Sequence, residues 1–205
     1  MPKIIVIGAS GTIGSAVADL LAANAEVVRV GNRRGDDTLD MEHKPSIEAL
    51  CQRLGTFDAL VCAAGASRFG TVLEASDEDF RVGIAGKLMG QVNLVRIALR
   101  YIPSGGSITL TTGLLGRQPA PGTAPTALVN AALEGFVRAA ALDLGPKVRI
   151  NAVSPIFVTA TADKMGLPVA GTMSAAETAK AYRASVYGKM TGQVLDVRDY
   201  GRVEG

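Results

Sequence analysis

The chain has 205 residues, of which 48% are hydrophobic, so it is long enough to bury one core and too short for two typical domains. Its 21 basic and 19 acidic residues give a formal net charge of +2, without the excess that a nucleic-acid or acidic-membrane partner would require. The apolar runs are broken by glycine, proline or charge well before membrane-spanning length. We expect one domain over residues 1–205 that acts on a small molecule.

Cysteine and histidine usage indicates a reducing compartment and no metal centre. Cys51 and Cys62 are the only cysteines, His43 is the only histidine, and no secretory signal precedes the first apolar run. Neither cysteine has metal-ligand spacing, and no carboxylate cluster accompanies His43. We therefore expect a cytoplasmic protein without a bound metal.

The N-terminal segment combines an apolar run, a glycine-rich loop and an amphipathic stretch. Ile4 to Ile7 leads directly into Gly8-Ala9-Ser10-Gly11-Thr12-Ile13-Gly14, and a helical pattern follows from Ser15 to Ala23. A backbone that turns sharply and lies against a pyrophosphate tolerates no side chain at the turn. Free amides at the helix start then attract the anion. This pattern predicts a dinucleotide-phosphate site, with an ordinary turn as the alternative.

Apolar strands and helices alternate through the first half of the chain. The patterns predict a strand from Glu26 to Val30, a polar turn at 32–35, a helix from Ser46 to Leu54 and a strand from Phe57 to Val61. Ser76 is placed to cap the next helix, which has three acidic residues in its first turn and is predicted to extend to Tyr101.

The second half continues this alternation. Its predicted elements are a strand from Ser107 to Thr112, a helix from Pro125 to Leu144, a strand from Val148 to Val153 and a strand from Gln193 to Val197. Such alternation predicts an α/β fold with a three-layer, doubly wound parallel sheet of the Rossmann type. Phe157 to Tyr187 lacks a clear period, so a region near 156–188 is either a lid that shapes a substrate site or a surface excursion without function.

Motifs along nearly the whole chain resemble the short-chain dehydrogenase/reductase family. The spacing of Gly8, Gly11 and Gly14 is similar to that family's Gly-x-x-x-Gly-x-Gly loop. The run from Cys62 to Gly65 resembles its Asn-Ala-Gly strand end, with the asparagine replaced. Residues 106–108 resemble the start of the family's catalytic-serine strand, and residues 130–136 resemble its catalytic-lysine helix. Residues 149–155 resemble its Val-Asn-x-Val-x-Pro segment, and residues 191–195 resemble its C-terminal Thr-Gly-Gln strand.

The end of the second predicted strand favours NADP(H) over NAD(H). An NAD-preferring enzyme places an acidic residue there, whereas the 2′-phosphate of NADP needs positive charge and hydrogen-bond donors. Asn32, Arg33 and Arg34 occupy this place, and Ser10 is close by in the glycine loop. Two solvated surface arginines are the alternative.

The resemblance implies further cofactor contacts. Asp40 with Met41 would meet the adenine, Ala64 and Gly65 would lie along the adenosine ribose, and Thr159 would approach the nicotinamide carboxamide. The expected cofactor residues are Gly8, Ser10, Gly11, Thr12, Ile13, Gly14, Asn32, Arg33, Arg34, Asp40, Met41, Ala63, Ala64, Gly65, Pro155 and Thr159.

The resemblance implies a catalytic pattern of a tyrosine acid, a lysine four residues later, a serine and an asparagine. This chain departs from that pattern at all four positions. Thr126 stands at the tyrosine position and Asn130 at the lysine position. Gly113, preceded by Thr112, stands at the serine position, and Lys87 stands at the asparagine position. An aliphatic hydroxyl is a poor acid at neutral pH, so the usual proton donor is missing.

Lys87 and Asn130 look like an exchange of two catalytic residues. If they converge, Lys87 would hold the ribose hydroxyls or polarise a carbonyl, and Asn130 would supply a neutral hydrogen bond; a solvated or interface lysine is the alternative. Thr112 either donates to a substrate oxygen or bonds to backbone. Tyr182 and Tyr187 are more readily explained as core or surface residues than as part of the site. The candidate catalytic residues are Lys87, Thr112, Thr126 and Asn130.

Three functions are compatible with these residues. The first is an NADP(H)-dependent oxidoreductase acting on a small carbonyl or alcohol. The second is a catalytically degenerate NADP(H)-binding protein that serves as a redox sensor or an assembly subunit. The third is reduction of an activated double bond or imine that needs no protein acid. Small residues in 125–144, beside 87–101, predict a homodimer or homotetramer, although they could pack on the sheet instead.

Overall fold

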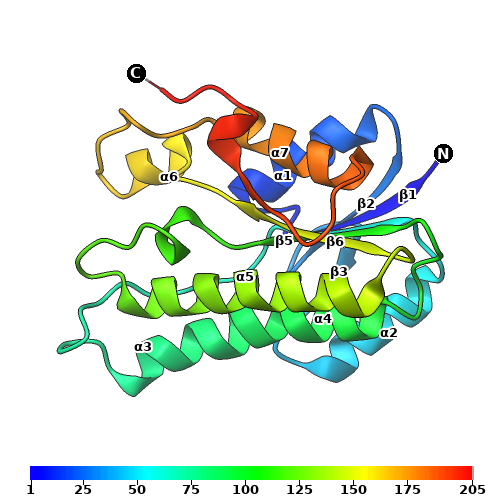
Figure 1. Cartoon of the computed structure of the whole chain (residues 1–205), viewed down its shortest axis with the longest axis horizontal. Coiled ribbons are helices and arrows are strands. Elements are labelled where there is room, and N and C mark those ends of the chain that lie inside the picture. The colour runs from blue at the N-terminus through cyan, green and yellow to red at the C-terminus, as the bar shows by residue number, and fades with distance from the viewer. Residues whose placement is uncertain (205) are drawn as a thin grey trace.

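The computed structural model describes residues 1–204. It contains a parallel sheet of seven strands with helices on both faces (Figure 1). Across the sheet the order is β3 (Asp37–Thr38), β2 (Glu26–Gly31), β1 (Lys3–Ile7), β4 (Ala59–Cys62), β5 (Ser107–Thr111), β6 (Arg149–Ser154) and β7 (Val194–Asp196). Every neighbouring pair is parallel. The predicted doubly wound, three-layer α/β fold is confirmed.

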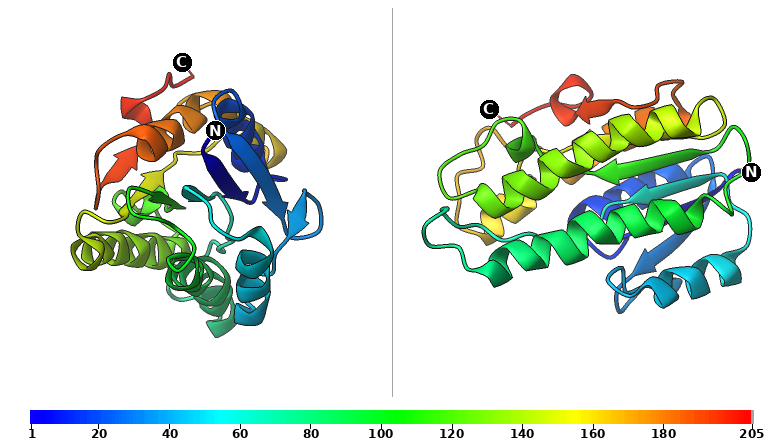
Figure 2. Two further views of the ribbon diagram at one scale, coloured as in Figure 1. Left: turned by 90° about the vertical axis from the view of Figure 1, so that its right-hand side faces the viewer. Right: turned by 60° about the horizontal axis from the view of Figure 1, so that its bottom comes forward.

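Alternation along the strands builds two separate cores. In β1, Ile5 and Ile7 belong to the core under α2 (Lys44–Leu54), α4 (Gly90–Ala98) and α5 (Ala124–Leu144). Ile4 and Val6 belong to the core under α1 (Thr12–Ala22) and α7 (Ala175–Tyr187) on the other face. Figure 2 shows the two helical layers on opposite sides of the sheet. Because both faces are covered, β4 is largely apolar and β1 nearly so, as buried parallel strands usually are, whereas β5 and β6 also bury polar side chains such as Thr109 and Asn151.

The helix predicted from Ser76 begins as expected but changes geometry along its length. The Ser76 hydroxyl accepts a hydrogen bond from the Asp79 amide, and the Asp79 carboxylate accepts one from the Ser76 amide, which closes a capping box. Three consecutive segments follow, namely α3 (Asp77–Val82), a π-helix (Gly83–Met89) and α4, so helical structure ends at Ala98 and not at Tyr101. The π-helical segment carries Lys87, and such segments are frequent at functional sites.

The region without sequence period divides into two parts. Residues 156–172 include the short α6 (Thr159–Lys164) and supply several walls of a cavity, as described below. α7, which the sequence patterns did not predict, packs on the sheet beside α1 and buries Tyr182 completely. Small residues occupy many of the buried positions of α7, so the hydrophobic periodicity of this helix is weak. The region near 156–188 is therefore a cavity wall followed by a core helix.

Candidate active site

Two cavities lie at the carboxyl ends of the strands and share the wall formed by Ala63, Ala64 and Gly65. The smaller, of about 400 Å³, has the glycine loop and the end of β2 along its sides. The larger, of about 640 Å³, extends towards α5 and residues 156–172. Together they form a site at the edge where doubly wound folds bind ligands. Its two adjoining compartments fit a dinucleotide with a substrate beside one end.

Gly8 and Gly11 of the glycine loop line the smaller cavity without side chains. Gly8 has a φ of +85°, and a Cβ there would lie 2.8 Å from the Ala63 carbonyl oxygen. A Cβ at Gly14 would collide with the Gly8 carbonyl. No side chain caps the start of α1, so the first-turn amides are available to an anion. These features fit the pyrophosphate of a nicotinamide dinucleotide.

The part of the smaller cavity next to the end of β2 contains several of the residues expected to meet the adenosine of a dinucleotide. Ser10, Asn32, Asp40 and Met41 line it, and a Cβ at Gly31 would lie 2.8 Å from the Ser10 hydroxyl oxygen. The Asp40 carboxylate accepts a hydrogen bond from the Glu42 amide at 3.0 Å, which orders the segment. Arg33 and Arg34, also expected there, are exposed beside Asn32 and do not line this cavity; within residues 1–204 neither forms an ion pair.

Lys87 and Asn130 converge in the wall of the larger cavity, where Lys87 packs against Gly65 of the shared wall. The Lys87 ammonium donates to the Asn130 Oδ1 at 2.6 Å and to the Thr112 carbonyl at 2.8 Å. Both residues are buried and line the larger cavity. Because both acceptors are neutral and no carboxylate pairs with Lys87 in the described chain, the ammonium keeps its positive potential towards the cavity. The convergence on which the exchange hypothesis depended is therefore present, and Lys87 is buried rather than solvated.

The Asn130 amide takes up the space that a serine-position side chain would need. A Cβ on Gly113 would lie 2.8 Å from Asn130 Nδ2, and a Cβ on Gly116 would lie 2.8 Å from Asn130 Cβ. The bond from Lys87 to Oδ1 orients the amide, so Nδ2 is the donor end. Nδ2 has no hydrogen-bond partner among residues 1–204 and remains available to a ligand. The Asn130 side chain thus packs closely against Lys87, Gly113 and Gly116.

The two threonines are committed to backbone acceptors. The Thr112 hydroxyl donates to the Val153 carbonyl at 3.3 Å. The Thr126 hydroxyl donates to the Arg68 carbonyl at 2.9 Å and lies 2.9 Å from the Ser67 hydroxyl. Thr126 therefore ties the loop after β4 to α5, and its hydroxyl proton is engaged in the protein. This is the backbone-bonded alternative that the sequence left open for Thr112.

Two other residues considered in the sequence analysis, Thr159 and Tyr182, do not line either cavity. Pro155 lines the larger cavity, but Thr159 does not; its hydroxyl lies 3.0 Å from that of Thr172, which is on the wall. The contact of Thr159 with a carboxamide stays a prediction. Tyr182 is a core residue that donates to the Thr111 hydroxyl at 2.7 Å, since Thr111 itself donates to the Cys62 carbonyl. Burial raises the pKa of Tyr182, so this phenol is no substitute for the missing acid.

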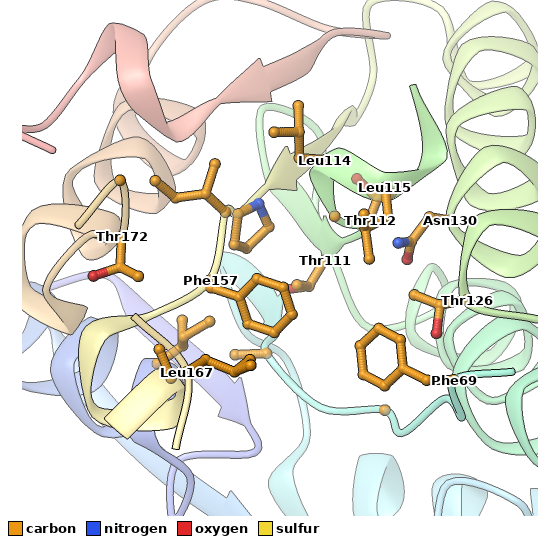
Figure 3. A pocket seen from close by; sticks show the side chains of 18 of the residues that line it. Phe69, Thr111, Thr112, Leu114, Leu115, Thr126, Asn130, Phe157, Leu167 and Thr172 are labelled. Atoms are coloured by element: carbon orange, nitrogen blue, oxygen red, sulfur yellow. The ribbon is translucent and has the colours of Figure 1, made fainter. Parts of the chain in front are cut away.

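Sequence reasoning missed the apolar part of the larger cavity. Figure 3 shows Phe69 and Thr126 on one side, Leu167 and Thr172 on the other, and Phe157 between them. Phe69 lies in the loop after β4 and Phe157 in the loop after β6, and neither loop has a motif that marks a ligand wall. The feature of the sequence that could have indicated these two residues was their position in loops that follow the carboxyl ends of predicted strands.

Burial lowers the pKa of Lys87 from its ordinary value of 10.5 to about 8. The neighbouring Cys62 thiol has a pKa raised to about 12 by burial, so it is neutral near pH 7 and provides no counter-ion. Of the residues that line the larger cavity, Lys87 is the one that titrates near neutrality. The site therefore contains a cation that can release its proton at modest cost.

This pKa predicts how stability depends on pH. The unfolded chain holds the Lys87 proton up to about pH 10.5, whereas the folded chain loses it near pH 8, so the unfolded state binds more protons between these values. The free energy of unfolding of the wild type, relative to Lys87→Met, is expected to rise by about 3 kcal/mol from pH 8 to 10.5. Urea unfolding of both proteins at several pH values measures this difference in the free energy of unfolding. A difference that stays constant with pH would contradict the assigned pKa.

Other kinds of site are not found in the described chain. Residues 1–204 contain no group of three or more His, Cys, Asp and Glu side chains that could hold a metal ion. Over the same residues, no helix has the length and apolarity to cross a bilayer. The pair of adjoining cavities is the feature that requires a functional explanation.

Comparisons with known proteins agree with this geometry. A family profile described as "Enoyl-(Acyl carrier protein) reductase" matches residues 11–197. An uncharacterised oxidoreductase of Mycobacterium tuberculosis is 32% identical, with 93% of this chain and 81% of that protein covered. The crystal structure of protein lin1944 from Listeria innocua has a TM-score of 0.90 at 37% identity, covering 96% of this chain and 100% of that one. A small-chain dehydrogenase crystallised with NADPH has a TM-score of 0.84 at 29% identity, covering 95% of each chain.

Proposed function

The chain belongs to the short-chain dehydrogenase/reductase family, and we propose that it is an NADP(H)-dependent oxidoreductase acting on a small carbonyl or alcohol substrate. The observation that carries this proposal is the Lys87–Asn130 pair in the wall of the larger cavity. A buried cation next to a free amide donor is suited to stabilise negative charge on a substrate oxygen.

The cofactor would lie along the glycine loop and across the shared wall. The α1 amides would hold the pyrophosphate, Asp40 and Met41 would flank the adenine, and Ala64 and Gly65 would border the ribose. Its nicotinamide would reach the larger cavity near Pro155 and Ile156. When bound there, a nicotinamide dinucleotide supplies or accepts a hydride.

Asn130 and Lys87 would act on the substrate oxygen. Asn130 Nδ2 would donate a hydrogen bond to the carbonyl oxygen, and Lys87 would hold Oδ1 so that the donor end faces the cavity. For reduction, we assign the proton to the Lys87 ammonium: one N–H bond breaks, the O–H bond of the alcohol forms, and the neutral amine takes a proton from solvent. A pKa of about 8 permits both steps near pH 7.

One observation favours the second candidate, a catalytically degenerate NADP(H)-binding protein that acts as a redox sensor or assembly subunit. The hydroxyl at the tyrosine position, that of Thr126, is already bonded to the Arg68 carbonyl. This protein would bind NADPH and turn over no carbonyl or imine. Titration of purified protein with NADPH, followed by a carbonyl screen, separates the two; failure to bind either dinucleotide would contradict both.

The preference for NADP(H) predicts a specific effect of the two turn arginines. Replacing both Arg33 and Arg34 by alanine should weaken NADPH binding by about 10- to 100-fold, because charge-assisted bonds to the 2′-phosphate are lost. NADH binding should stay within about twofold, since NADH lacks that phosphate. Nicotinamide fluorescence at fixed salt measures both affinities. Arg100→Ala, beyond the other end of the strands, is the matched control. Equal weakening for both dinucleotides would contradict the preference.

We also propose a homodimer or homotetramer in the reducing cytoplasm. Along the outer side of α5, small residues such as Ala131 and Ala139 are exposed together with Leu128 and Leu142, which suits close helix packing between subunits. Both cysteines are free thiols. Light scattering of the purified protein tests the assembly.

A further inference from the structure

The walls of the larger cavity contain no acidic side chain, arginine or histidine among the described residues. Lys87 is its one charged group, and two of its protons are already donated to protein oxygens. The remaining wall is mainly apolar and is formed by Phe69, Leu114, Leu115, Ile156, Phe157 and Leu167. A carboxylate or phosphate on the distal part of a substrate would lose its hydration there without a partner. The cavity therefore suits a neutral, apolar molecule.

Phe69 and Phe157 form a stacked aromatic pair at this cavity. Their ring centroids are 6.2 Å apart and their planes differ by 23°. The two residues are 48% and 37% exposed, so much of their aromatic surface remains uncovered. Exposed aromatic side chains that line a cavity are typical of ligand contacts, and a flat ring is the partner that stacks best on them.

Both rings stand on backbone that is held in place. On either side of Phe69, the Thr126 hydroxyl donates to the Arg68 carbonyl, and the Gly70 amide donates to the Gly122 carbonyl at 2.7 Å. The Phe157 carbonyl accepts from the Met173 amide at 3.1 Å, and the preceding Pro155 carbonyl accepts from the Leu114 amide at 2.9 Å. Residues held in this way lose little freedom when a ligand binds.

We infer that the substrate is a neutral carbonyl compound with a flat ring system, which stacks on Phe69 and Phe157 while its oxygen faces Asn130. This inference rests on the proposed function and specifies its substrate class. Phe69 and Phe157 are then the residues that determine specificity, and Thr126 is a positioning residue that holds the loop of Phe69.

Three ketones test the inference with the NADPH-loaded protein. 1-Tetralone is neutral and bicyclic, 2-decanone is an open chain with the same number of carbon atoms, and 5-carboxy-1-tetralone adds a charge. We expect the highest kcat/KM with 1-tetralone and a value at least about 10-fold lower with the carboxylate. Phe69→Leu and Phe157→Leu should each raise KM for 1-tetralone by about 3- to 10-fold, leave kcat within about twofold and leave 2-decanone unaffected.

Leu73→Ala is the matched control, because Leu73 is 97% exposed and lies outside the cavity wall. Equal kcat/KM for 1-tetralone and 2-decanone, or equal effects of the leucine variants on both, would overturn the ring inference and leave the oxidoreductase intact. If NADPH binds but no ketone is reduced, the proposed function fails. Ligand-observed NMR of 1-tetralone with the loaded protein then decides: binding weakened by Phe157→Leu supports the ring subsite, and no binding overturns it.

Discussion

Replacing Lys87 by methionine is expected to lower kcat/KM for carbonyl reduction by about 10²- to 10³-fold, the usual effect of removing one electrostatic contact to a developing oxyanion. Methionine fills a similar volume but carries no charge and no N–H. The Asn130 amide then loses the donor that orients it, so its Nδ2 no longer faces the substrate reliably. Steady-state kinetics with saturating NADPH measure the loss.

Three comparisons make this result specific. Lys180→Met removes a partly exposed lysine that pairs with Glu177 on α7, and it should leave kcat/KM unchanged. The double variant of Lys87→Met and Asn130→Ala should be scarcely worse than either single variant, because the two residues act as one unit. If Lys87→Met instead weakens NADPH binding as much as it lowers kcat/KM, Lys87 holds the ribose; full activity would remove it from the mechanism.

The same pair predicts the pH profile of the reaction. Since reduction uses the protonated Lys87, kcat/KM for reduction should fall as the pH rises through about 8, and alcohol oxidation should increase over the same range. Lys87→Met should lose this inflection. An unchanged profile in that variant would assign the proton to another group.

Gly14→Ala should abolish useful cofactor affinity, with NADPH binding weakened by at least about 100-fold. The added Cβ would overlap the Gly8 carbonyl, so the start of α1 must move away from the loop that receives the pyrophosphate. The same collision should lower the free energy of unfolding by about 1–3 kcal/mol. NADPH fluorescence titration and urea unfolding measure the two effects.

Ser15→Ala is the matched control for this substitution. It changes the adjacent residue of α1 without adding an atom, and the Ser15 side chain has no hydrogen-bond partner among residues 1–204. Affinity and stability should therefore stay near the wild-type values. Wild-type NADPH affinity in Gly14→Ala would mean that the glycine loop does not contact the cofactor.

Strand prediction succeeded because the strands are short segments rich in apolar and β-branched residues and are bounded by glycine, proline or polar residues. The cores of β1, β2, β5 and β6 were predicted within one or two residues. β3, with two residues, is too short to produce a pattern, and it was missed. α7 was missed because its buried face relies on small residues as well as Tyr182, so the contrast between its faces is weak.

By itself, the sequence determined the longer strands, the glycine loop and the capped helix at Ser76, because each depends on local spacing or on a short motif; Lys87 and Asn130 became candidates through the family resemblance. Only the tertiary structure decided which side chains meet. Lys87 reaches Asn130 across 43 residues of chain, and Phe69 stacks on Phe157 from the loop after a different strand. These contacts depend on strand order and on the burial of Lys87 within the π-helical segment. Local periodicity reports which face of an element is buried, and it contains no information about the partner brought to that face.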